Sequence, residues 1–552
     1  MNGALVVLIA FFLLALVLGL WSRRGKEMDI EQWSVGGRNF GAIFVFLLLA
    51  GEIYTTFTFL GASGYAYTYG GAAFYILGYG ALAYVISYWL APAIWRYAKR
   101  EKLVSQPDWF RRKYDSRNLS LVVAVIGIVA MVPYLELQLT GLGIIVQETS
   151  YGSISRTAAI WIGAIVMAVY VVAAGIHAAA WNAVVKDVLV LVVVVFIGIY
   201  LPMHYFGGVG SMMHTIHEQK PGFLSANLPS HDMGWFITSI LLSALGFFMW
   251  PHYFGAIYAS RDTRTFRRNA MFLPLYQLVL LFVFFTGLAA VLVVPGLSDG
   301  DLSLLAISRK TFSPVVVGLI GAAGIFCALV PGAMLLSTSA TLLAKNVVHE
   351  FRPGLSGRQT AVVAKALVPV ITLVALYLTF AGGDAIVNLL LLGYAFVTQL
   401  FPSMIASLHP RNPVTKWGAG AGMVVGAVLV TWLTLGKHTA GDVLPFLPGS
   451  WQHLNVGIVA LVANVVICVA VSLATGERVR SRSRQSLQGV RHQSAPETQN
   501  AGEHPAGYYL IKDAAVSGPV DGARRSPRFP HRDNQGFYLA GASPRVVSGG
   551  EA

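Results

Sequence analysis

Thirteen long apolar stretches separated by short polar segments fill residues 1–475, and this feature constrains the fold more than any other. A bilayer core about 30 Å thick needs roughly 20 apolar residues per helix. Transmembrane β-strands would instead be short segments of alternating hydrophobicity. The sequence therefore predicts an all-α polytopic membrane protein with about 13 transmembrane helices, which begin near Leu5, Phe40, Ala72, Leu119, Thr157, Val184, Gly234, Met271, Val315, Val363, Ala385, Trp417 and Leu454.

Lysine and arginine are distributed unequally between the two ends of these predicted helices. The connections at one end hold 23 of them, and those at the other end hold 5. Because cytoplasmic loops carry the excess of basic residues, we expect a protein of the cell (inner) membrane with its N-terminus outside and its C-terminus in the cytoplasm. The same loops and the C-terminal tail account for the formal net charge of +14, so nucleic acid is not an expected partner.

Two predicted spans have polar or helix-breaking residues near their centres. The second span contains residues 51–56 (GEIYTT), and the seventh contains Gly246 and Pro251 on either side of an aromatic run. A carboxyl at bilayer depth is costly and should face protein or water, and a proline removes a helix hydrogen bond. We therefore expect helix breaks at Gly51, Gly246 and Pro251.

The two interrupted spans are five apart, so each would open a block of five helices. Because five is odd, the second block starts from the opposite face of the membrane, which is the topology of an inverted repeat with a binding site at the midplane. The predicted parts are an extra first helix and cytoplasmic loop (1–39), the first repeat (40–206), an extracellular loop (207–234), the second repeat (235–408), two final helices (409–475) and a disordered cytoplasmic tail (476–552).

Four segments in this order resemble the solute:sodium symporter family. They are residues 33–38 (WSVGGR), 59–64 (FLGASG), 245–248 (LGFF) with the following Pro251-His252, and 339–343 (SATLL). The resemblance implies a five-plus-five inverted-repeat core like that of the leucine transporter. It also implies secondary active, ion-coupled symport of a small solute by alternating access, with sodium bound between spans 2 and 9.

The resemblance places the sodium-binding backbone carbonyls at Gly51 and Tyr54, yet the facing span departs from the family pattern. Residues 328–330 (ALV) stand where the family has a pair of hydroxyl side chains, and a hard cation needs several oxygen ligands. The coupling ion is therefore expected to be either Na⁺, as in the family, or H⁺.

The candidates for proton coupling are acids within apolar spans, where desolvation favours the protonated form. They are Glu52, Glu136 and Asp187. Asp187 follows Lys186 at the start of span 6, where residues 181–183 (WNA) replace the family's Trp-Thr-Asp. An alternative for this pair is an interfacial anchor, in which Lys186 extends to the membrane surface and Asp187 neutralises it.

Residues 133–141 and 181–187 resemble segments of bacterial monocarboxylate permeases of this family, which implies a small organic anion such as pyruvate, lactate or acetate. The N-termini of half-helices offer N–H groups to an anion. The alternatives are a sodium-coupled symporter of an amino acid or vitamin, and an uncoupled channel or facilitator. The candidate substrate-binding residues are Thr55, Thr56, Phe247 and Trp250, which lie near the two breaks in the sequence, and Tyr134 and Gln138, which lie within residues 133–141.

The sequence does not predict an enzyme. It has no catalytic constellation at membrane depth and no Gly-rich, Lys-terminated phosphate-binding motif. Its two cysteines, Cys327 and Cys468, lie within predicted spans and suggest neither a disulfide framework nor a metal site. We expect no metal and no cofactor beyond the coupling ion. The expected partners are a lipid bilayer and a small organic anion. The sequence does not determine the oligomeric state.

Overall fold

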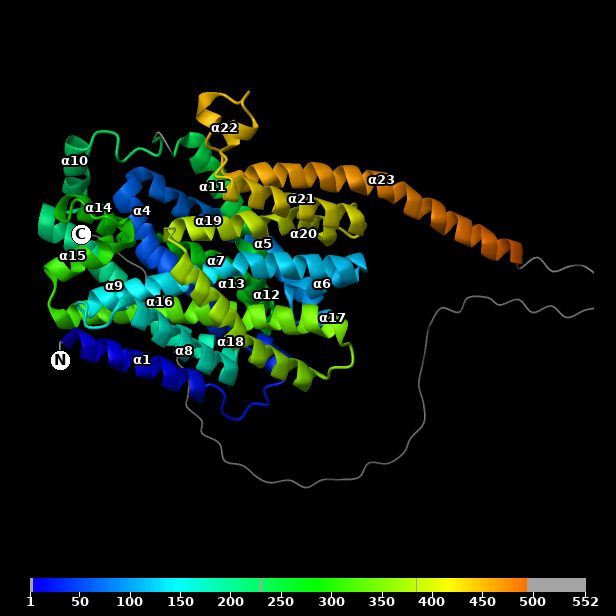
Figure 1. The fold of residues 1–552 in the computed structure, drawn as a ribbon, viewed down its shortest axis with the longest axis horizontal. Coiled ribbons are helices and arrows are strands. Elements are labelled where there is room, and N and C mark those ends of the chain that lie inside the picture. The colour runs from blue at the N-terminus through cyan, green and yellow to red at the C-terminus, as the bar shows by residue number, and fades with distance from the viewer. Residues whose placement is uncertain (1–2, 229–230, 384, 494–552) are drawn as a thin grey trace, which may run out of the picture. The chain divides into compact units, whose positions relative to one another are not determined.

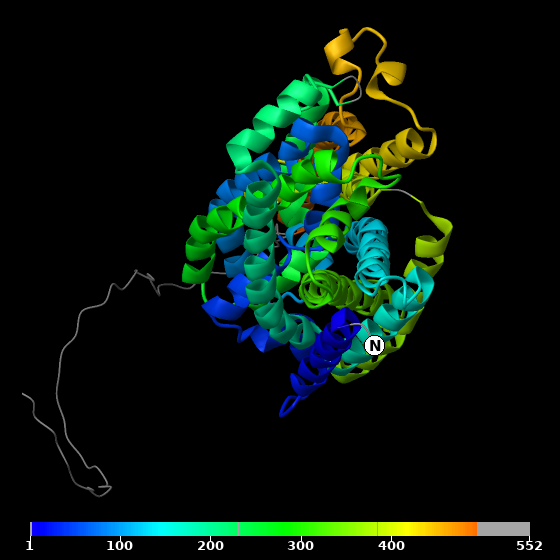
Figure 2. The same cartoon turned by 90° about the vertical axis from the view of Figure 1, so that its left-hand side faces the viewer.

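A computed structural model describes residues 3–228, 231–383 and 385–493 of the chain. The chain divides into two units, residues 1–487 and 488–552, and only residues 488–493 of the second are described. The described residues are helical and contain no β-strand. The long helices of the first unit lie side by side (Figure 1) and are foreshortened when the view is turned by 90° (Figure 2).

Nine of the predicted spans are single helices and four consist of two helical pieces. The single helices are α1 (Gly3–Trp21), α5 (Tyr75–Arg100), α7 (Arg117–Thr149), α8 (Arg156–Ala174), α9 (Ile176–Phe206), α16 (Pro314–Thr341), α18 (Gly357–Ala381), α21 (Lys416–Leu435) and α23 (Val456–Gln493). The paired pieces are α3 (Ala42–Gly51) and α4 (Ala62–Tyr69), α11 (Met233–Gly246) and α12 (Pro251–Ala259), α13 (Arg264–Leu278) and α14 (Leu280–Val293), and α19 (Ile386–Val397) and α20 (Phe401–Leu408).

Shorter helices connect or extend these spans. The α-helical ones are α2 (Ile30–Val35), α6 (Gln106–Tyr114), α10 (Val209–Gln219), α15 (Ser303–Thr311), α17 (His349–Phe351) and α22 (Ala440–Val443). The 3₁₀ turns are η1 (Gly36–Arg38), η3 (Gly70–Phe74), η4 (Phe247–Met249), η5 (Gly300–Leu302), η7 (Thr398–Leu400) and η8 (Gly449–Trp451), and the π-helical turns are η2 (Phe57–Gly61) and η6 (Leu342–Val348).

The number of membrane crossings depends on the stretch Phe57–Arg100. By length and apolarity, the described residues contain 11 candidate spans, or 12 with the bent pair α11–α12. Phe57–Arg100 counts as one span, although a straight helix of its length would be about 66 Å long, twice the bilayer core. The chain reverses direction within this stretch. The N–H of Phe40 and Nε1 of Trp95 donate to the adjacent carbonyls of residues 259 and 260, so residues 40 and 95 lie close together. The N–H of Gly71, which lies between them in sequence, donates instead to the carbonyl of Phe223. With α3–α4 and α5 counted separately, the described residues contain 13 candidate spans.

The helix α16 lies at the centre of the bundle. It packs against α1, α7, α8, α9 and α18, and nearly all its side chains from Val317 to Thr341 are buried. The outer helices instead expose large apolar side chains, such as Val192 on α9 and Val428 on α21, each 62% exposed. A surface of this kind suits lipid tails.

A tight turn between α8 and α9 fixes the start of α9. Gly175 adopts φ +54°, and a Cβ added to it would lie 2.2 Å from the backbone carbonyl oxygen of Trp33. The indole Nε1 of Trp33 in turn donates to the carbonyl of Val171 at 3.1 Å. Glycine at position 175 thus permits both the left-handed backbone and the close approach of the chain that leads into α3.

The last helix ends beyond the sequence-based boundary at residue 475. The structure continues α23 to Gln493, and residues 494–552 of the predicted tail lie outside the described residues. Arg and Gln, which are frequent in 478–493, are good helix formers. Extending an existing helix also avoids the cost of nucleation.

Substitution of Gly175 by alanine should destabilise the protein by about 1–3 kcal/mol, because the new methyl group meets a backbone carbonyl and φ is positive. The measurement is thermal melting of the purified protein in detergent. The matched control is Gly152→Ala, where φ is +77° but no atom lies within 4 Å of the added methyl. Equal melting temperatures for the two variants would contradict the role given to the Trp33 contact.

Candidate substrate and ion site

The two interrupted spans bring their breaks together inside the bundle. Helix α3 ends at Gly51, and helical structure resumes only at Phe57. Helix α11 ends at Gly246, Trp250 is extended with ψ 131°, and α12 begins at Pro251 with a bend of 49°. The breaks therefore fall at the residues that the sequence analysis selects for them.

An acid and a histidine connect the two breaks. Glu52 Oε2, just after α3, lies 3.1 Å from Nε2 of His252 at the start of α12, and both side chains are fully buried. The hydroxyl of Tyr134 on α7 donates to the same carboxylate oxygen at 3.4 Å. Glu52 Oε1 and His252 Nδ1 have no hydrogen-bond partner among the described residues. Buried polar atoms are normally paired, so this cluster is suited to a polar ligand.

Three successive backbone N–H groups precede the second half of the broken span. Thr55 N donates to Thr58 Oγ1 at 2.8 Å, Thr56 N donates to Gln138 Oε1 at 3.3 Å, and Phe57 N donates to Thr55 Oγ1 at 3.2 Å. Gln138 Nε2 has no partner among the described residues. The structure thus brings Thr55, Thr56 and Gln138 together at a helix N-terminus, where an anion would compete with these side-chain oxygens for the N–H groups.

Aromatic rings line the other side of the breaks. Trp250 packs on Tyr134 and Tyr394, with ring centroids 5.0 and 5.4 Å apart. Phe247 packs on Tyr79 and Tyr253. The two aromatic candidates from the sequence, Phe247 and Trp250, therefore lie in one buried layer beside Tyr134, and they can shape a small apolar group.

The expected sodium site is occupied by a lysine side chain. Lys186 Nζ donates hydrogen bonds to the backbone carbonyls of Gly51 and Tyr54, the latter at 2.8 Å, and its side chain is fully buried. Asp187 Oδ1 lies 3.5 Å from the same nitrogen. The alternative that Lys186 extends to the membrane surface is therefore wrong, because the freed carbonyls of the broken helix give its ammonium group better partners than the interface would.

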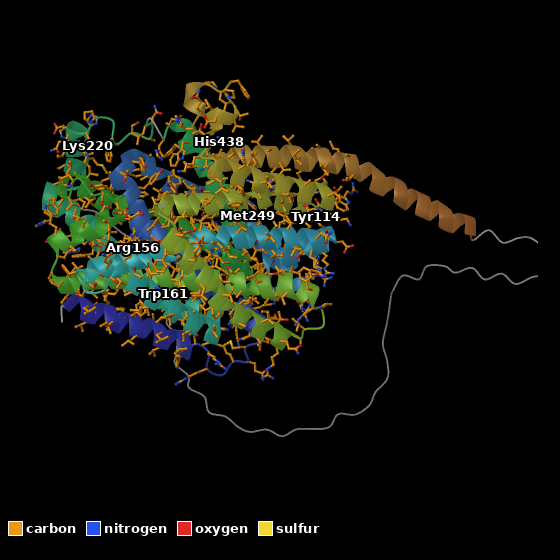
Figure 3. All side chains as sticks on the ribbon, viewed as in Figure 1. Tyr114, Arg156, Trp161, Lys220, Met249 and His438 are labelled. Atoms are coloured by element: carbon orange, nitrogen blue, oxygen red, sulfur yellow. The ribbon has the colours of Figure 1, made fainter. Side chains whose placement is uncertain are left out.

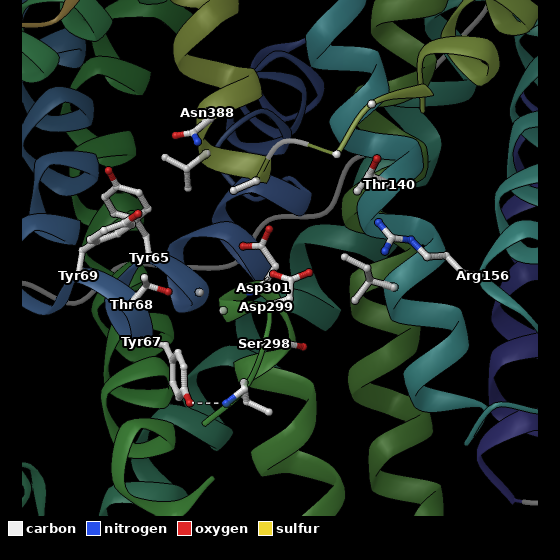
Figure 4. A pocket seen from close by; sticks show the side chains of 18 of the residues that line it. Tyr65, Tyr67, Thr68, Tyr69, Thr140, Arg156, Ser298, Asp299, Asp301 and Asn388 are labelled. Carbon is white, nitrogen blue, oxygen red and sulfur yellow. Dashed lines mark hydrogen bonds between the residues drawn. The ribbon is translucent and has the colours of Figure 1, made fainter. Parts of the chain in front are cut away.

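Glu136 lies away from this cluster, in an outer cavity of about 830 Å³. The cavity is lined by parts of α4, α7 and α8, by the segment before α15 and by Lys220. Figure 4 shows Asp299 and Asp301 close together, with the guanidinium of Arg156 pointing toward them. Of the three acids predicted as proton-coupling candidates, the structure thus brings Glu52 and Asp187 to the breaks and leaves Glu136 in the cavity.

Two residues that matter in this geometry were given no site role by the sequence analysis. His252 was noted only as part of a family-like segment, although a histidine next to a helix-breaking proline at membrane depth is a signal for function. Lys186 was considered only together with Asp187, as an interfacial anchor. Its reach to the first broken helix depends on tertiary packing and carries no local signal.

The described residues contain no group of three or more His, Cys, Asp or Glu side chains able to hold a metal ion. Cys327 and Cys468 are buried free thiols.

Comparison with known proteins identifies the family. Residues 33–426 match the sodium:solute symporter family, and the chain therefore belongs to it. The uncharacterized symporter YhjB of Bacillus subtilis (strain 168) is 55% identical over 477 residues, which cover 86% of this chain and 98% of that protein. The monocarboxylate transport permease protein of Rhizobium johnstonii is 31% identical over 491 residues, which cover 85% of this chain and 97% of that protein.

Among solved structures, a Na⁺-coupled sialic acid symporter has a TM-score of 0.71 at 16% identity, covering 86% of this chain and 98% of that one. This likeness confirms the predicted leucine-transporter-like fold. Together with the family, it makes the chain a multi-pass membrane transporter of the ion-coupled symporter class, and not an enzyme.

The outer cavity gives this protein a testable pH dependence. Burial raises the pKa of Asp301 from its ordinary value of 3.8 to about 7, and the nearby Asp299 adds to the shift, whereas the N–H of Ile386 and the charge of Arg156 oppose it. The folded chain thus binds this proton more tightly than the unfolded chain. Its contribution to stability is present in full below pH 3.8 and is lost as the pH rises to about 7.

Asp301→Asn removes this titration, so its melting temperature should fall less than that of the wild type as the pH rises from about 4 to about 7. Asp299→Asn should show a smaller change in the same direction, because it removes a like charge beside Asp301. Melting curves recorded across this pH range test both. Parallel curves for the wild type and Asp301→Asn would contradict the assignment.

Proposed function

We propose that this protein takes up a small monocarboxylate, of the pyruvate, lactate or acetate class, by ion-coupled symport. The observation that carries the proposal is a cluster of buried polar atoms at or beside the two helix breaks that have no partner among the described residues, namely Glu52 Oε1, Gln138 Nε2 and His252 Nδ1. They lie beside aromatic rings, and a small molecule with one polar end and one apolar end needs both kinds of neighbour. The 31% identity to a monocarboxylate permease over nearly the whole chain supports the same class.

In this proposal the carboxylate of the substrate binds at the N-terminus of the second half of the broken span. The N–H groups of Thr56 and Phe57 would exchange their present side-chain acceptors for substrate oxygens, and Gln138 Nε2 and the Tyr134 hydroxyl would donate from α7. The methyl end of the substrate would face Trp250 and Phe247.

The proposal includes the proton as the coupling ion, with Glu52 as its carrier. Two carboxylates, of the substrate and of Glu52, repel each other in a buried site, and a proton held by Glu52 and His252 removes that repulsion. The other candidates have weaker support, since Glu136 lines the outer cavity and Asp187 faces Lys186. The family supports Na⁺ as the alternative coupling ion.

We further propose that the outer cavity opens to the outside of the inner membrane. Lys220, which lines the cavity, and Tyr114, in the Lys- and Arg-rich connection after α5, lie toward opposite ends of the helices (Figure 3). The positive-inside rule then places the N-terminus outside and the C-terminus in the cytoplasm. Residues 40–206 and 235–408 are the two repeats that would move against each other around the breaks.

Proteoliposomes that hold the purified protein should accumulate labelled pyruvate or lactate against a concentration gradient when a proton gradient, acidic outside, is imposed. Unlabelled acetate should compete, whereas proline should not, because a Glu52 that carries the coupling proton offers no negative charge to the ammonium group of proline. Accumulation distinguishes a coupled symporter from an uncoupled channel, which only equilibrates its solute. Uptake of proline in place of these acids would overturn the substrate class.

Glu52→Gln should lose accumulation driven by the proton gradient by roughly 5- to 150-fold, the usual range for loss of coupling between two sites. Exchange of labelled for unlabelled substrate should persist, because a glutamine resembles the protonated acid. Glu136→Gln is the matched control and should accumulate substrate as the wild type does. Full proton-driven accumulation by Glu52→Gln would show that Glu52 does not carry the coupling proton.

A further inference from the structure

The ammonium group of Lys186 lies where the family resemblance places a sodium ion, between the break after α3 and α16. An ammonium has three N–H donors and no acceptor. Three oxygen groups surround it: the carbonyl of Gly51, the carbonyl of Tyr54 at 2.8 Å and the carboxylate of Asp187 at 3.5 Å. Neither carboxylate oxygen of Asp187 accepts a hydrogen bond within the described part of the chain. The ion pair with Lys186 is therefore the interaction that balances its charge.

Apart from Lys186, the side-chain atoms nearest to Gly51 in this site are hydrocarbon. A Cβ built on Gly51 would lie 3.5 Å from Lys186 Nζ, 3.8 Å from Val330 Cγ1 and 3.9 Å from the methyl of Ala183. The carbonyl of Leu329, on the same part of α16, already accepts a hydrogen bond from the Tyr170 hydroxyl at 2.7 Å. While Lys186 occupies the Gly51 and Tyr54 carbonyls and pairs with Asp187, a sodium ion would find few free oxygen ligands here, so the residues present do not fit it.

A sodium ion would also be repelled by the ammonium. Two unit charges at such a short distance repel each other strongly inside a protein, where the effective dielectric is lower than in water. Removing the ammonium with no ion in its place would leave Asp187 as an unpaired buried charge, which is also unfavourable.

We propose that Lys186 replaces the sodium ion of this site as a tethered cation, so that transport by this chain does not require sodium. The lysine stabilises the break as a bound ion would, but it cannot leave with the substrate. The gradient of sodium across the membrane then does no work through this site. The proposal rests on the chain being a symporter of this family and not on the class of its substrate.

The first test is thermal melting of the purified full-length protein in sodium chloride and in choline chloride at equal ionic strength. The wild type should melt at the same temperature in both salts. Lys186→Ala should melt lower in choline and recover by roughly 2–4 °C in sodium, because Na⁺ can then bind the Gly51 and Tyr54 carbonyls and Asp187. Adding Val330→Ser should enlarge the sodium effect, since it supplies a further oxygen.

Lys99→Ala is the matched control, because it removes an exposed ammonium at the end of α5 and should show no sodium effect. A sodium-specific rise in the melting temperature of the wild type, equal to or larger than that of Lys186→Ala, would overturn the proposal. A Lys186→Ala protein that folds and does not respond to sodium would overturn it as well.

The second test needs no variant and covers the case in which Lys186→Ala does not fold. Wild-type proteoliposomes loaded with unlabelled pyruvate should exchange it for labelled pyruvate equally fast in sodium and in choline. A saturable sodium requirement would overturn the tethered-cation proposal. Lack of pyruvate, lactate and acetate exchange in both salts would instead refute the proposed substrate class, and the melting experiment would still decide the role of Lys186.

Discussion

The structure depends on how the backbone groups freed by a broken helix are satisfied inside a membrane. Between Gly51 and Phe57 the chain gives up its helical hydrogen bonds in a place where water cannot replace them, and each unsatisfied group would cost several kcal/mol. Side chains from the break itself and from two neighbouring helices supply the missing partners. Irregular backbone is tolerated at this depth only because it is enclosed by protein.

The freed carbonyls and the freed N–H groups have different partners. The freed carbonyls of Gly51 and Tyr54 accept hydrogen bonds from the ammonium of Lys186 on α9. The freed carbonyl of Ile53 accepts one from the hydroxyl of Thr58. The freed N–H groups donate hydrogen bonds to side-chain oxygens of Thr55, Thr58 and Gln138. A break in a helix thus creates a cation site on one side and an anion site on the other, which is the arrangement that symport of an anion with a cation requires.

The tethered cation changes what this arrangement can couple. A free ion enters and leaves with each transport cycle, whereas Lys186 stays with α9 in every state. If one cation site holds a residue of the protein, the driving ion must act elsewhere. The Glu52–His252 pair connects the two breaks, and it lies where a change in protonation would be felt by both repeats.

The second break is simpler, because Pro251 cannot continue the helix and Trp250 adopts an extended backbone before it. Its consequence is the placement of His252 at a helix start, aimed at an acid on the other interrupted span. Trp250 and Phe247 fill the space around the bend, and packing of aromatic rings fixes the direction of α12.

The sequence by itself determined the class of fold. Hydrophobic length gives the spans, and Gly51, Gly246 and Pro251 mark the breaks, because these properties are local to a segment. The replacement of hydroxyls by Leu329 and Val330 also showed in the sequence that the sodium site departs from the family pattern. Only the tertiary structure decided which group fills that site, since Lys186 is 132 residues from Tyr54 along the chain. Likewise, Glu52 and Glu136 look alike in the sequence, and packing alone separates them, because the low-dielectric surroundings and partners of a carboxyl are set by residues distant in sequence.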